Sequence, residues 1–296
     1  MKTSLVVGMG IGSLYVKVLE ELGHGVITVD SDPEKKADFL TVEDAINECR
    51  LFDTAHICTP NFTHAKIAQQ LAPFTGIVFV EKPGVANSEV WTTLWHTYKN
   101  TRFMMVKNNM WRDNLAEMRS HVAGARTVKI KWINKNRIPS PGTWFTTKEL
   151  AYGGVSRDLM PHLLSLYIAL NPMWRTAQMT GQESRQLWTL DKIEDSEYGT
   201  VKRDGVYDVD DLAKIKYMQN GRVWKMVANW ADSQADDRCV EFEKDDGTVT
   251  RFELGLCPEE AYKAMIAEAV ANKDNFEFWK QQFEYDTYIH ERIENL

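Results

Sequence analysis

The sequence predicts an N-terminal α/β unit with a parallel, doubly wound sheet, followed by an α+β unit with a large, open and mostly antiparallel sheet. In residues 1–113, short apolar runs alternate with segments of helical periodicity on short connections, which is typical of parallel sheets. In residues 114–296, strand-like segments alternate apolar and polar side chains, and two turn signals join strands as hairpins. Because 296 residues exceed the usual size of one hydrophobic core, we expect two domains, 1–113 and 114–296.

The elements of the first domain follow in regular order. SLVVGMG is an apolar run that ends in glycines, as a buried parallel strand does. A helical pattern over residues 12–22 comes next and stops at Gly23. The same order then repeats, with strands expected over 26–30, 55–59, 77–82 and 103–108 and helices over 41–49, 63–72 and 88–99.

The second domain has a different pattern. TVKIKWI (127–133) alternates strictly, with Val128, Ile130 and Trp132 on one face and lysines on the other. The remaining expected elements are hairpins at Asn220-Gly221 and Asp246-Gly247, helices over 155–170, 258–271 and about 276–294, and a long polar loop over 190–206, a length at which loops are often functional.

The composition is that of an ordinary globular protein, with 44% hydrophobic and 26% charged residues. The net charge of −7 disfavours a general affinity for nucleic acid or an anionic membrane surface. No apolar run has the length of a membrane span, and the N-terminus is typical of a first strand and not of a secretory signal. The four cysteines are scattered without metal-ligand spacing, so we expect reduced thiols, no metal site and a cytoplasmic location.

A glycine-rich loop, GMGIGS (8–13), joins the first strand to the first helix, which is the context of a phosphate-binding loop. Gly8 allows the tight turn, and Gly10 lets the backbone approach a pyrophosphate at the helix N-terminus. Gly12 comes one residue before the usual third glycine, whose position is taken by the small Ser13. The alternative is a glycine-rich turn of another α/β protein. The cofactor contacts expected in the loop are Gly8, Gly10, Ile11 and Gly12.

Asp30 supports the dinucleotide interpretation. It ends the second expected strand 20 residues after Gly10, where an acid accepts hydrogen bonds from the ribose hydroxyls of an adenosine. A carboxylate there repels a 2′-phosphate, so NAD is the expected cofactor. Lys35 and Lys36 follow closely and can soften this discrimination, which leaves NADP open.

The segment AYGGVSRDLMPHLLSL (151–166) places a carboxylate and an imidazole beside an apolar helical stripe. Asp158 and His162 are four residues apart, about one helical turn. Two interpretations stay open from this segment alone. The pair is either a core histidine satisfied by a carboxylate or a functional pair.

Three motifs complete a pattern with the glycine loop and Asp30. They are CTPNFTH (58–64), VEKPG (80–84) and GGVSRDLMPH (153–162). Together they resemble the glucose–fructose oxidoreductase and inositol dehydrogenase family, Gfo/Idh/MocA, over nearly the whole chain. The resemblance implies an N-terminal Rossmann domain, an α+β domain with a large open sheet, and an NAD(P)-dependent oxidoreductase acting on a hydroxyl of a sugar, polyol or related small molecule.

The resemblance also implies roles for individual residues. It makes the loop at Thr59, Pro60, Asn61 and His64 a cofactor contact near the nicotinamide. It places Lys82 in the active site and against the cofactor, with Glu81 near the nicotinamide ribose. It puts Asp158 and His162 on the substrate side, and Asn109 matches the family's asparagine after the last Rossmann strand.

These residue types fit the oxidation of an alcohol. A proton leaves the oxygen as a hydride leaves the carbon, and a neutral imidazole, with a reference pKa of about 6.5, can accept that proton. A lysine can stabilise the developing alkoxide or share the proton. We therefore expect Lys82, His162 and Asp158 to be catalytic, with Asp158 holding His162 or binding a sugar hydroxyl. Which of Lys82 and His162 accepts the proton stays open.

The chain departs from the family at three places. Trp111-Arg112 replaces the expected Arg-Phe order, and Val155 stands where a third glycine is common. Pro161 lies between Asp158 and His162, where it removes a backbone donor and can bend the helix. These differences concern the substrate more than the reaction.

The remaining candidate residues can each be interpreted as functional or as structural. Trp144 lies before the active-site helix and can stack on a sugar ring, so it joins Lys82, Asn109, Asp158 and His162 as an expected substrate contact. Cationic residues that could bind an acidic substrate, or form a solvated face, are Arg112, Lys129 and Lys131. Histidines and tryptophans expected in structural, surface or interface roles are His24, His56, His96, His121, His290, Trp132, Trp224 and Trp230.

Two other functions stay open: a redox-neutral enzyme that recycles NAD during glycoside cleavage or epimerisation, and a non-catalytic dinucleotide-binding sensor.

The apolar strand face of the second domain exceeds what its few helices can cover. We therefore expect a homodimer, or a homotetramer of dimers, through that sheet.

Overall fold

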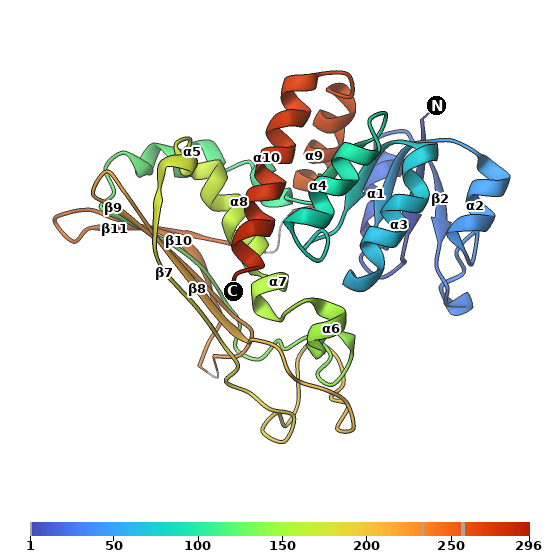
Figure 1. The fold of residues 1–296 in the computed structure, drawn as a ribbon. Helices are drawn as coiled ribbons and strands as arrows, with labels where there is room; N and C mark the ends of the chain where they lie inside the picture. The colour runs from blue at the N-terminus through green and yellow to red at the C-terminus, as the bar shows by residue number, and fades with distance from the viewer. Residues whose placement is uncertain (1, 233, 256–257) are drawn as a thin grey trace. The chain divides into compact units, whose positions relative to one another are not determined.

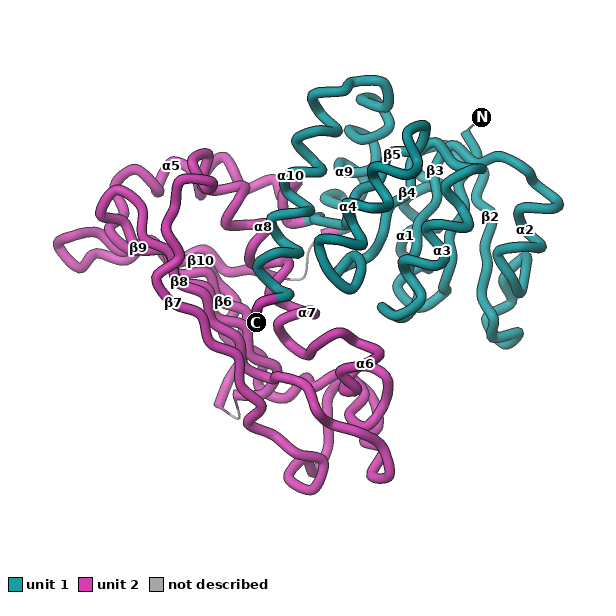
Figure 2. The backbone as a smooth tube through the Cα atoms, viewed as in Figure 1, with its two compact units in different colours: residues 1–108, 259–294 teal, residues 109–258, 295–296 magenta. Residues whose placement is uncertain are grey.

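The computed structural model describes residues 2–232, 234–255 and 258–296, which form two compact units (Figure 1 and Figure 2). Unit 1 consists of residues 1–108 and 259–294, and unit 2 of residues 109–258 and 295–296. Each unit is built around its own sheet.

Unit 1 contains a five-stranded, wholly parallel sheet in the order β2-β1-β3-β4-β5, which confirms the predicted α/β unit. In this order the chain reverses its direction of travel between β1 and β3, which is where doubly wound sheets bind ligands. The strands are β1 (Thr3–Val7), β2 (Gly25–Val29), β3 (Phe52–Ile57), β4 (Thr75–Val80) and β5 (Arg102–Met105).

Four helices connect these strands. Because crossovers between parallel strands are right-handed, α1 lies on one face of the sheet and α2, α3 and α4 on the other. In agreement, α3 packs on both α2 and α4. Helix α2 begins after Thr41, whose hydroxyl accepts a hydrogen bond from the Asp44 N–H at 3.1 Å. The four helices are α1 (Gly12–Glu21), α2 (Val42–Cys49), α3 (His64–Leu71) and α4 (Ser88–Thr97).

The last two helices, α9 (Glu259–Ala271) and α10 (Phe276–Ile293), belong to unit 1 (Figure 2). Helix α9 packs on α1, and α10 packs on α4 and β5. Asp286 of α10 forms a fully buried ion pair with Lys107 and accepts a hydrogen bond from the Met105 N–H at 3.0 Å. The compact units therefore do not follow the expected division into 1–113 and 114–296, because the C-terminal segment supplies core to the N-terminal sheet.

His56 of β3 lies fully buried in this core. Its ring stacks on Phe79 at a centroid distance of 4.7 Å, and Nε2 lies 3.0 Å from the Thr54 hydroxyl. Burial lowers the pKa of His56 to about 3, so the folded unit holds a neutral imidazole. In the unfolded chain the ring has its ordinary pKa of about 6.5. The stability that this neutral ring contributes is complete above that pH and is lost as the pH falls toward 3.

We expect acid to destabilise the wild-type protein more steeply than a His56→Phe variant between pH 6.5 and 4. The unfolded wild-type chain takes up a proton that the folded state excludes, which costs up to about 1.4 kcal/mol per pH unit. Urea unfolding of both proteins at several pH values measures the difference. Parallel pH profiles would contradict it.

Unit 2 contains a six-stranded sheet in the order β11-β10-β6-β9-β8-β7. All neighbouring strands are antiparallel except β6 and β9, so the predicted mostly antiparallel sheet is confirmed. Both predicted hairpins are present, and Asn220 and Gly221 have the positive φ values that a tight hairpin turn requires. The strands are β6 (Thr127–Ile133), β7 (Gln178–Arg185), β8 (Leu212–Gln219), β9 (Arg222–Asn229), β10 (Asp237–Glu243) and β11 (Val249–Glu253).

The helix expected over 155–170 is divided into α7 (Val155–Asp158) and α8 (Met160–Leu170). The break falls at Leu159, and Pro161 therefore lies in the first turn of α8. A proline is tolerated there because the N–H that it lacks would have no partner within the helix. Two short helices that the pattern did not predict are α5 (Leu115–Val122) and α6 (Lys148–Ala151).

The apolar face of this sheet is covered within the unit. Helix α8 packs on β6 and β9. Val128, Ile130 and Trp132 are only 0%, 0% and 7% exposed. On the opposite face Lys129 and Lys131 form ion pairs with acids of β10. The premise of the expected dimer, an uncovered apolar face, is therefore wrong. The homodimer or homotetramer itself stays a prediction, which light scattering tests.

Two further features concern the apolarity of the helices and the state of the cysteines. Among the described residues, no helix combines the length and apolarity that crossing a bilayer requires. Cys49, Cys58 and Cys239 are free thiols, and Cys257 lies outside the described residues.

Candidate active site

The glycine loop lies at the carboxyl end of β1. Gly8 has a φ of +92°, and a Cβ atom there would lie 2.8 Å from the carbonyl oxygen of Cys58. A Cβ atom on Gly12 would lie 2.9 Å from a side chain of β1, which explains the close packing of α1 on the sheet. Gly10 differs, because nothing lies within 4 Å of its Cβ position, and Ile11 beside it is 45% exposed. The loop thus has a packed base and an open side at the N-terminus of α1.

Asp30 follows β2 and is tied to this loop. One of its carboxylate oxygens accepts a hydrogen bond from the Met9 N–H at 2.6 Å, and the other accepts one from the Asp32 N–H at 2.9 Å. The side chain is half-buried. Because each carboxylate oxygen has a further lone pair, Asp30 can still accept hydrogen bonds from ribose hydroxyls.

The loop after β3 neighbours the glycine loop, since β1 and β3 are adjacent strands. The hydroxyls of Thr59 and Thr63 share a hydrogen bond of 2.6 Å, and the Thr63 hydroxyl also lies 2.7 Å from the Pro60 carbonyl oxygen. Thr59, Pro60 and Asn61 are half-buried, so this loop keeps an accessible side.

His64 lies beneath that loop. It is fully buried, and its two ring nitrogens each lie 2.7 Å from a backbone carbonyl oxygen, those of Thr59 and Gly84. Burial lowers the pKa of His64, while the two carbonyl groups act in the opposite direction. Both ring nitrogens are engaged by the backbone, so His64 links the loop after β3 to the loop after β4.

Glu81 and Lys82 follow β4. Glu81 is 8% exposed, and its carboxylate accepts hydrogen bonds from the Tyr15 hydroxyl at 2.5 Å and the Lys82 N–H at 3.1 Å. Burial, and then the charge of Glu81, raise the pKa of Tyr15 well above its usual value. Further along, the Val85 N–H donates to Nε2 of the buried His290 at 3.1 Å. These contacts hold the backbone on both sides of the half-buried Lys82.

In unit 2, Asp210 anchors the start of the segment that carries Asp158 and His162. Its carboxylate accepts hydrogen bonds from the N–H groups of Gly154 and Ser156, each at 2.8 Å. A Cβ atom on Gly154 would lie 1.8 Å from the Asp210 carbonyl oxygen, and Gly153 has a φ of +153°. The paired glycines are therefore required for this close approach and this turn.

Asp158 and His162 are the half-buried residues of a segment, 153–171, in which every other residue is buried. Trp230 Nε1 donates a hydrogen bond to Asp158 Oδ2 at 2.8 Å. The His162 ring stacks on Trp132 with ring centroids 5.8 Å apart and an interplanar angle of 24°. The two tryptophans, expected in sheet-face or interface roles, thus contact the pair directly. The strand pattern placed Trp132 on the apolar face without showing what that face packs against, and Trp230 lies just beyond the end of β9.

Asn109 and Arg112 lie behind His162. The Asn109 amide nitrogen donates to His162 Nδ1 at 3.1 Å, and Arg112 Nε donates to Asn109 Oδ1 at 2.7 Å. Asn109 is 0% exposed and Arg112 is 8% exposed, although the sequence offers both as candidates for substrate contacts.

The structure places Trp144 on a separate turn, Trp144–Thr146, where its half-buried ring stacks on Phe145.

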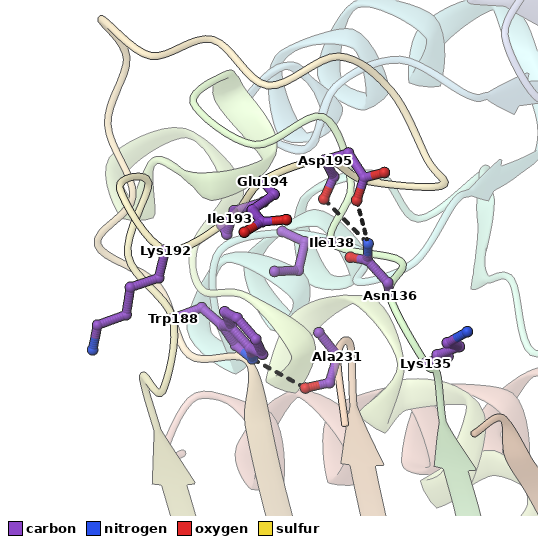
Figure 3. Close-up of a pocket in the computed structure, with 9 residues that line it drawn as sticks. All are labelled: Lys135, Asn136, Ile138, Trp188, Lys192, Ile193, Glu194, Asp195 and Ala231. Carbon is purple, nitrogen blue, oxygen red and sulfur yellow. Dashed lines mark hydrogen bonds between the residues drawn. The ribbon is translucent and has the colours of Figure 1, made fainter. Parts of the chain in front are cut away.

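A cavity of about 350 Å³ opens beyond the carboxyl ends of β6 and β9 (Figure 3). Trp188 Nε1 donates to the Ala231 carbonyl at 3.0 Å, and the Asn136 amide donates to Asp195 at 3.0 Å. The predicted loop 190–206 supplies part of the wall. The lining residue Ala231 follows in the chain directly after Trp230, which donates the hydrogen bond to Asp158. The lining residues are Lys135, Asn136, Ile138, Trp188, Lys192, Ile193, Glu194, Asp195 and Ala231.

Across residues 2–232, 234–255 and 258–296, no three His, Cys, Asp or Glu side chains are grouped so that they could hold a metal ion.

No family model matches the chain. A curated relative from Amycolatopsis mediterranei (strain S699), named "Putative UDP-kanosamine synthase oxidoreductase subunit", is 28% identical over 282 residues, covering 86% of this chain and 76% of the relative.

Solved structures match the whole architecture. GenD2 from gentamicin A biosynthesis, in complex with NAD, has a TM-score of 0.76 at 17% identity and covers 99% of this chain and 92% of its own. A myo-inositol dehydrogenase from Corynebacterium glutamicum has a TM-score of 0.72 at 14% identity, covering 100% and 95%. Levoglucosan dehydrogenase, in complex with NADH and levoglucosan, has a TM-score of 0.72 at 15% identity, covering 99% and 97%.

Identities this low establish the fold and not the substrate. The motifs, the order of the two sheets and the solved structures agree on that fold. At this level the chain has the fold of these solved proteins, a Rossmann sheet followed by an open, mostly antiparallel sheet, which is the architecture that the sequence predicted.

Proposed function

We propose that the chain is an NAD-dependent oxidoreductase that moves a hydride between the nicotinamide and a hydroxyl or keto carbon of a sugar, polyol or sugar derivative. The observation that carries the proposal is the glycine loop at the point where the strand order reverses, open at Gly10 and flanked by Asp30. The solved relatives support it, since GenD2 was crystallised with NAD and levoglucosan dehydrogenase with NADH and levoglucosan.

The residues of unit 1 fit a dinucleotide. The open side of the loop admits a pyrophosphate to the backbone N–H groups at the start of α1. The Asp30 carboxylate accepts ribose hydroxyls and repels a 2′-phosphate, which favours NAD over NADP. Bound NAD supplies the hydride acceptor, and that chemistry is the cofactor's own. Residues proposed to contact its nicotinamide half are Thr59, Pro60, Asn61, Glu81 and Lys82.

The chain's own residues are proposed to bind the substrate and to accept or donate the proton of its reacting hydroxyl. Lys82, on a backbone held by Glu81 and His290, is proposed to stabilise the developing alkoxide or accept its proton. Asp158 and His162, half-buried in a segment whose other residues are buried, are proposed to bind the reacting hydroxyl. Trp144 is proposed as a stacking surface for the sugar ring.

The test is NADH formation, followed by the near-ultraviolet absorbance of the reduced ring, on a panel of sugars, polyols and sugar acids, with NADP in parallel. The proposal predicts net NADH formation with at least one member and a preference for NAD. If no member of the panel yields NADH although the protein binds NADH tightly, net oxidation would be overturned, and the redox-neutral enzyme or the dinucleotide-binding sensor would be favoured. A protein that neither forms NADH with any member of the panel nor binds NADH would overturn the proposal entirely.

A further inference from the structure

A chain of hydrogen bonds through the buried side chains of Arg112 and Asn109 ends on the His162 ring. Arg112 Nη2 donates to the Gly255 carbonyl at 2.8 Å, and Arg112 Nε donates to Asn109 Oδ1 at 2.7 Å. The Asn109 amide nitrogen lies 3.1 Å from His162 Nδ1. Asn109 and Arg112 are three residues apart at the turn Asn108–Trp111, so local backbone geometry brings them together. All of these groups belong to unit 2.

The chemistry of these groups determines the direction of each hydrogen bond. A guanidinium only donates, so the Asn109 atom that faces Arg112 must be the carbonyl oxygen. The amide N–H group must then face His162. An amide nitrogen does not accept hydrogen bonds, so Nδ1 of His162 has to be the acceptor and carries no proton. In a neutral ring, the proton is therefore on Nε2.

The same contact disfavours the doubly protonated ring. An imidazolium carries a proton on Nδ1, which would point at the N–H group of Asn109, and two donors would face each other without an acceptor. Asn109 cannot rotate its amide to relieve this conflict without turning an N–H group toward Arg112. Because Asn109 is 0% exposed, water cannot replace either partner.

We infer that Asn109 and Arg112 are positioning residues that hold His162 in the tautomer with its proton on Nε2. This inference deepens the proposed function and rests on it for the reaction itself. His162 then serves as a fixed hydrogen-bond donor to the substrate oxygen, and it is not the group that accepts the substrate's proton. A neutral histidine can polarise an oxygen in this way when its surroundings prevent protonation.

The proton balance follows from this assignment. When the substrate is oxidised, its O–H bond breaks and the proton forms an N–H bond on another base. The proposed function supplies that base as the neutral Lys82 amine, which becomes an ammonium. His162 keeps its Nε2 proton before and after the step. Reduction runs the same exchange backwards, with the ammonium returning the proton.

The Trp132 ring, stacked on His162, helps to hold the imidazole plane. The stacked contact limits rotation about the side-chain bond, and the Asn109 bond selects which ring edge faces inward. An aromatic contact alone would not distinguish the two tautomers, because both have the same shape. The tautomer therefore depends on Asn109 and Arg112 and not on packing.

Nitrogen NMR of the full-length chain labelled with ¹⁵N-histidine reads the tautomer directly and needs no substrate. The His162 signals are identified by their loss in a His162→Gln variant. Near neutral pH we expect the chemical shift of an unprotonated nitrogen at Nδ1 and of a protonated nitrogen at Nε2. A proton on Nδ1 in the wild-type chain would overturn the inference.

Two variants separate positioning from simple packing. In Asn109→Asp, one carboxylate oxygen keeps the Arg112 bond and the other faces Nδ1 as an acceptor, so the proton should move to Nδ1. In Arg112→Lys, a donor still faces the Asn109 oxygen, so the wild-type spectrum should be retained. An unchanged His162 spectrum in folded Asn109→Asp would contradict the inference, and if that variant does not fold, the wild-type spectrum decides alone.

Activity provides a separate readout once the panel yields a substrate. Asn109→Asp should lower kcat by about 10²-fold or more, since an enzyme histidine held in the wrong tautomer loses its function. NADH affinity should stay unchanged, because the glycine loop and Asp30 belong to unit 1. If the panel shows no hydride transfer, the proposed function fails, and the NMR result still decides the tautomer.

Discussion

Replacing Lys82 by alanine is expected to lower kcat for the substrate found in the panel by about 10²- to 10⁴-fold, the usual contribution of a positioned acid–base group. If His162 acts only as a hydrogen-bond donor, Lys82 is the remaining residue proposed to accept the proton of the substrate hydroxyl. NADH should still bind, with its affinity reduced only by the loss of the proposed Lys82 contact, since Glu81 and the glycine loop stay in place. Kinetic constants and NADH titrations of the same preparation measure both effects.

Two controls accompany that variant. Lys66→Ala removes an exposed lysine of α3 in the same unit and should leave kcat unchanged. Small primary amines added to Lys82→Ala should restore part of the lost rate, because they can carry the missing proton. A Lys82→Ala enzyme with near-wild-type kcat would show that another group performs the proton transfer.

The Lys107→Met variant is expected to lose about 3–5 kcal/mol of unfolding free energy. Both members of the Lys107–Asp286 pair are fully buried, and the change leaves the Asp286 carboxylate without its cation. Burial already raises the pKa of Asp286 to about 6, so the uncompensated charge is costly at neutral pH. Urea or guanidinium unfolding measures the loss.

The matched control is Lys17→Met, which breaks the pair of Lys17 with Glu259 of α9. Those side chains are 57% and 46% exposed, so water screens the pair and the expected loss is much smaller than that of Lys107→Met. A double variant, Lys107→Met with Asp286→Leu, should recover much of the stability, because it removes both charges. Equal losses in Lys107→Met and Lys17→Met would contradict the role of the buried pair in joining α10 to unit 1.

The periodicity of apolar residues was sufficient to predict strands that are either buried on both faces or buried on one face and exposed on the other. The buried strands of unit 1 and the alternating strand Thr127–Ile133 could be located because their side-chain patterns report burial directly. Strand β7 (Gln178–Arg185) could not, since it lies at the sheet edge with mostly exposed residues and no apolar alternation. Its strand conformation comes from pairing with β8, which is a tertiary contact.

The sequence also could not show how the C-terminal helices are used. Helices α9 and α10 have ordinary amphipathic patterns, and nothing in those patterns states which sheet they cover. Their return to unit 1 depends on pairs that are far apart in the sequence, such as Lys107 with Asp286. The dimer premise failed for a similar reason, because one helix, α8, covers much of the apolar face.

The candidate site was predictable where a motif sets the chemistry. The glycine loop, Asp30 and the Asp158–His162 pair were predicted from residue type and spacing, and Glu81-Lys82 from the family resemblance; the roles of all these residues stay predictions. The hydrogen bonds behind them were not, because Arg112 and Asp210 act through contacts that sequence spacing does not reveal. A buried arginine beside the asparagine was visible in the sequence only as a departure from the family pattern.

The measurement that tests the central claim most directly is a calorimetric titration of NADH into the wild-type chain and a Gly10→Val variant. Gly10 has open space around its Cβ position and no positive φ, so valine should leave the fold intact while blocking the approach of a pyrophosphate. Gly124→Val places the same side chain at an exposed turn as the control. We expect one NADH per wild-type or Gly124→Val chain and an affinity at least about 10-fold weaker in Gly10→Val. Equal affinity in all three proteins, or no binding to the wild type, would contradict a dinucleotide site at this loop.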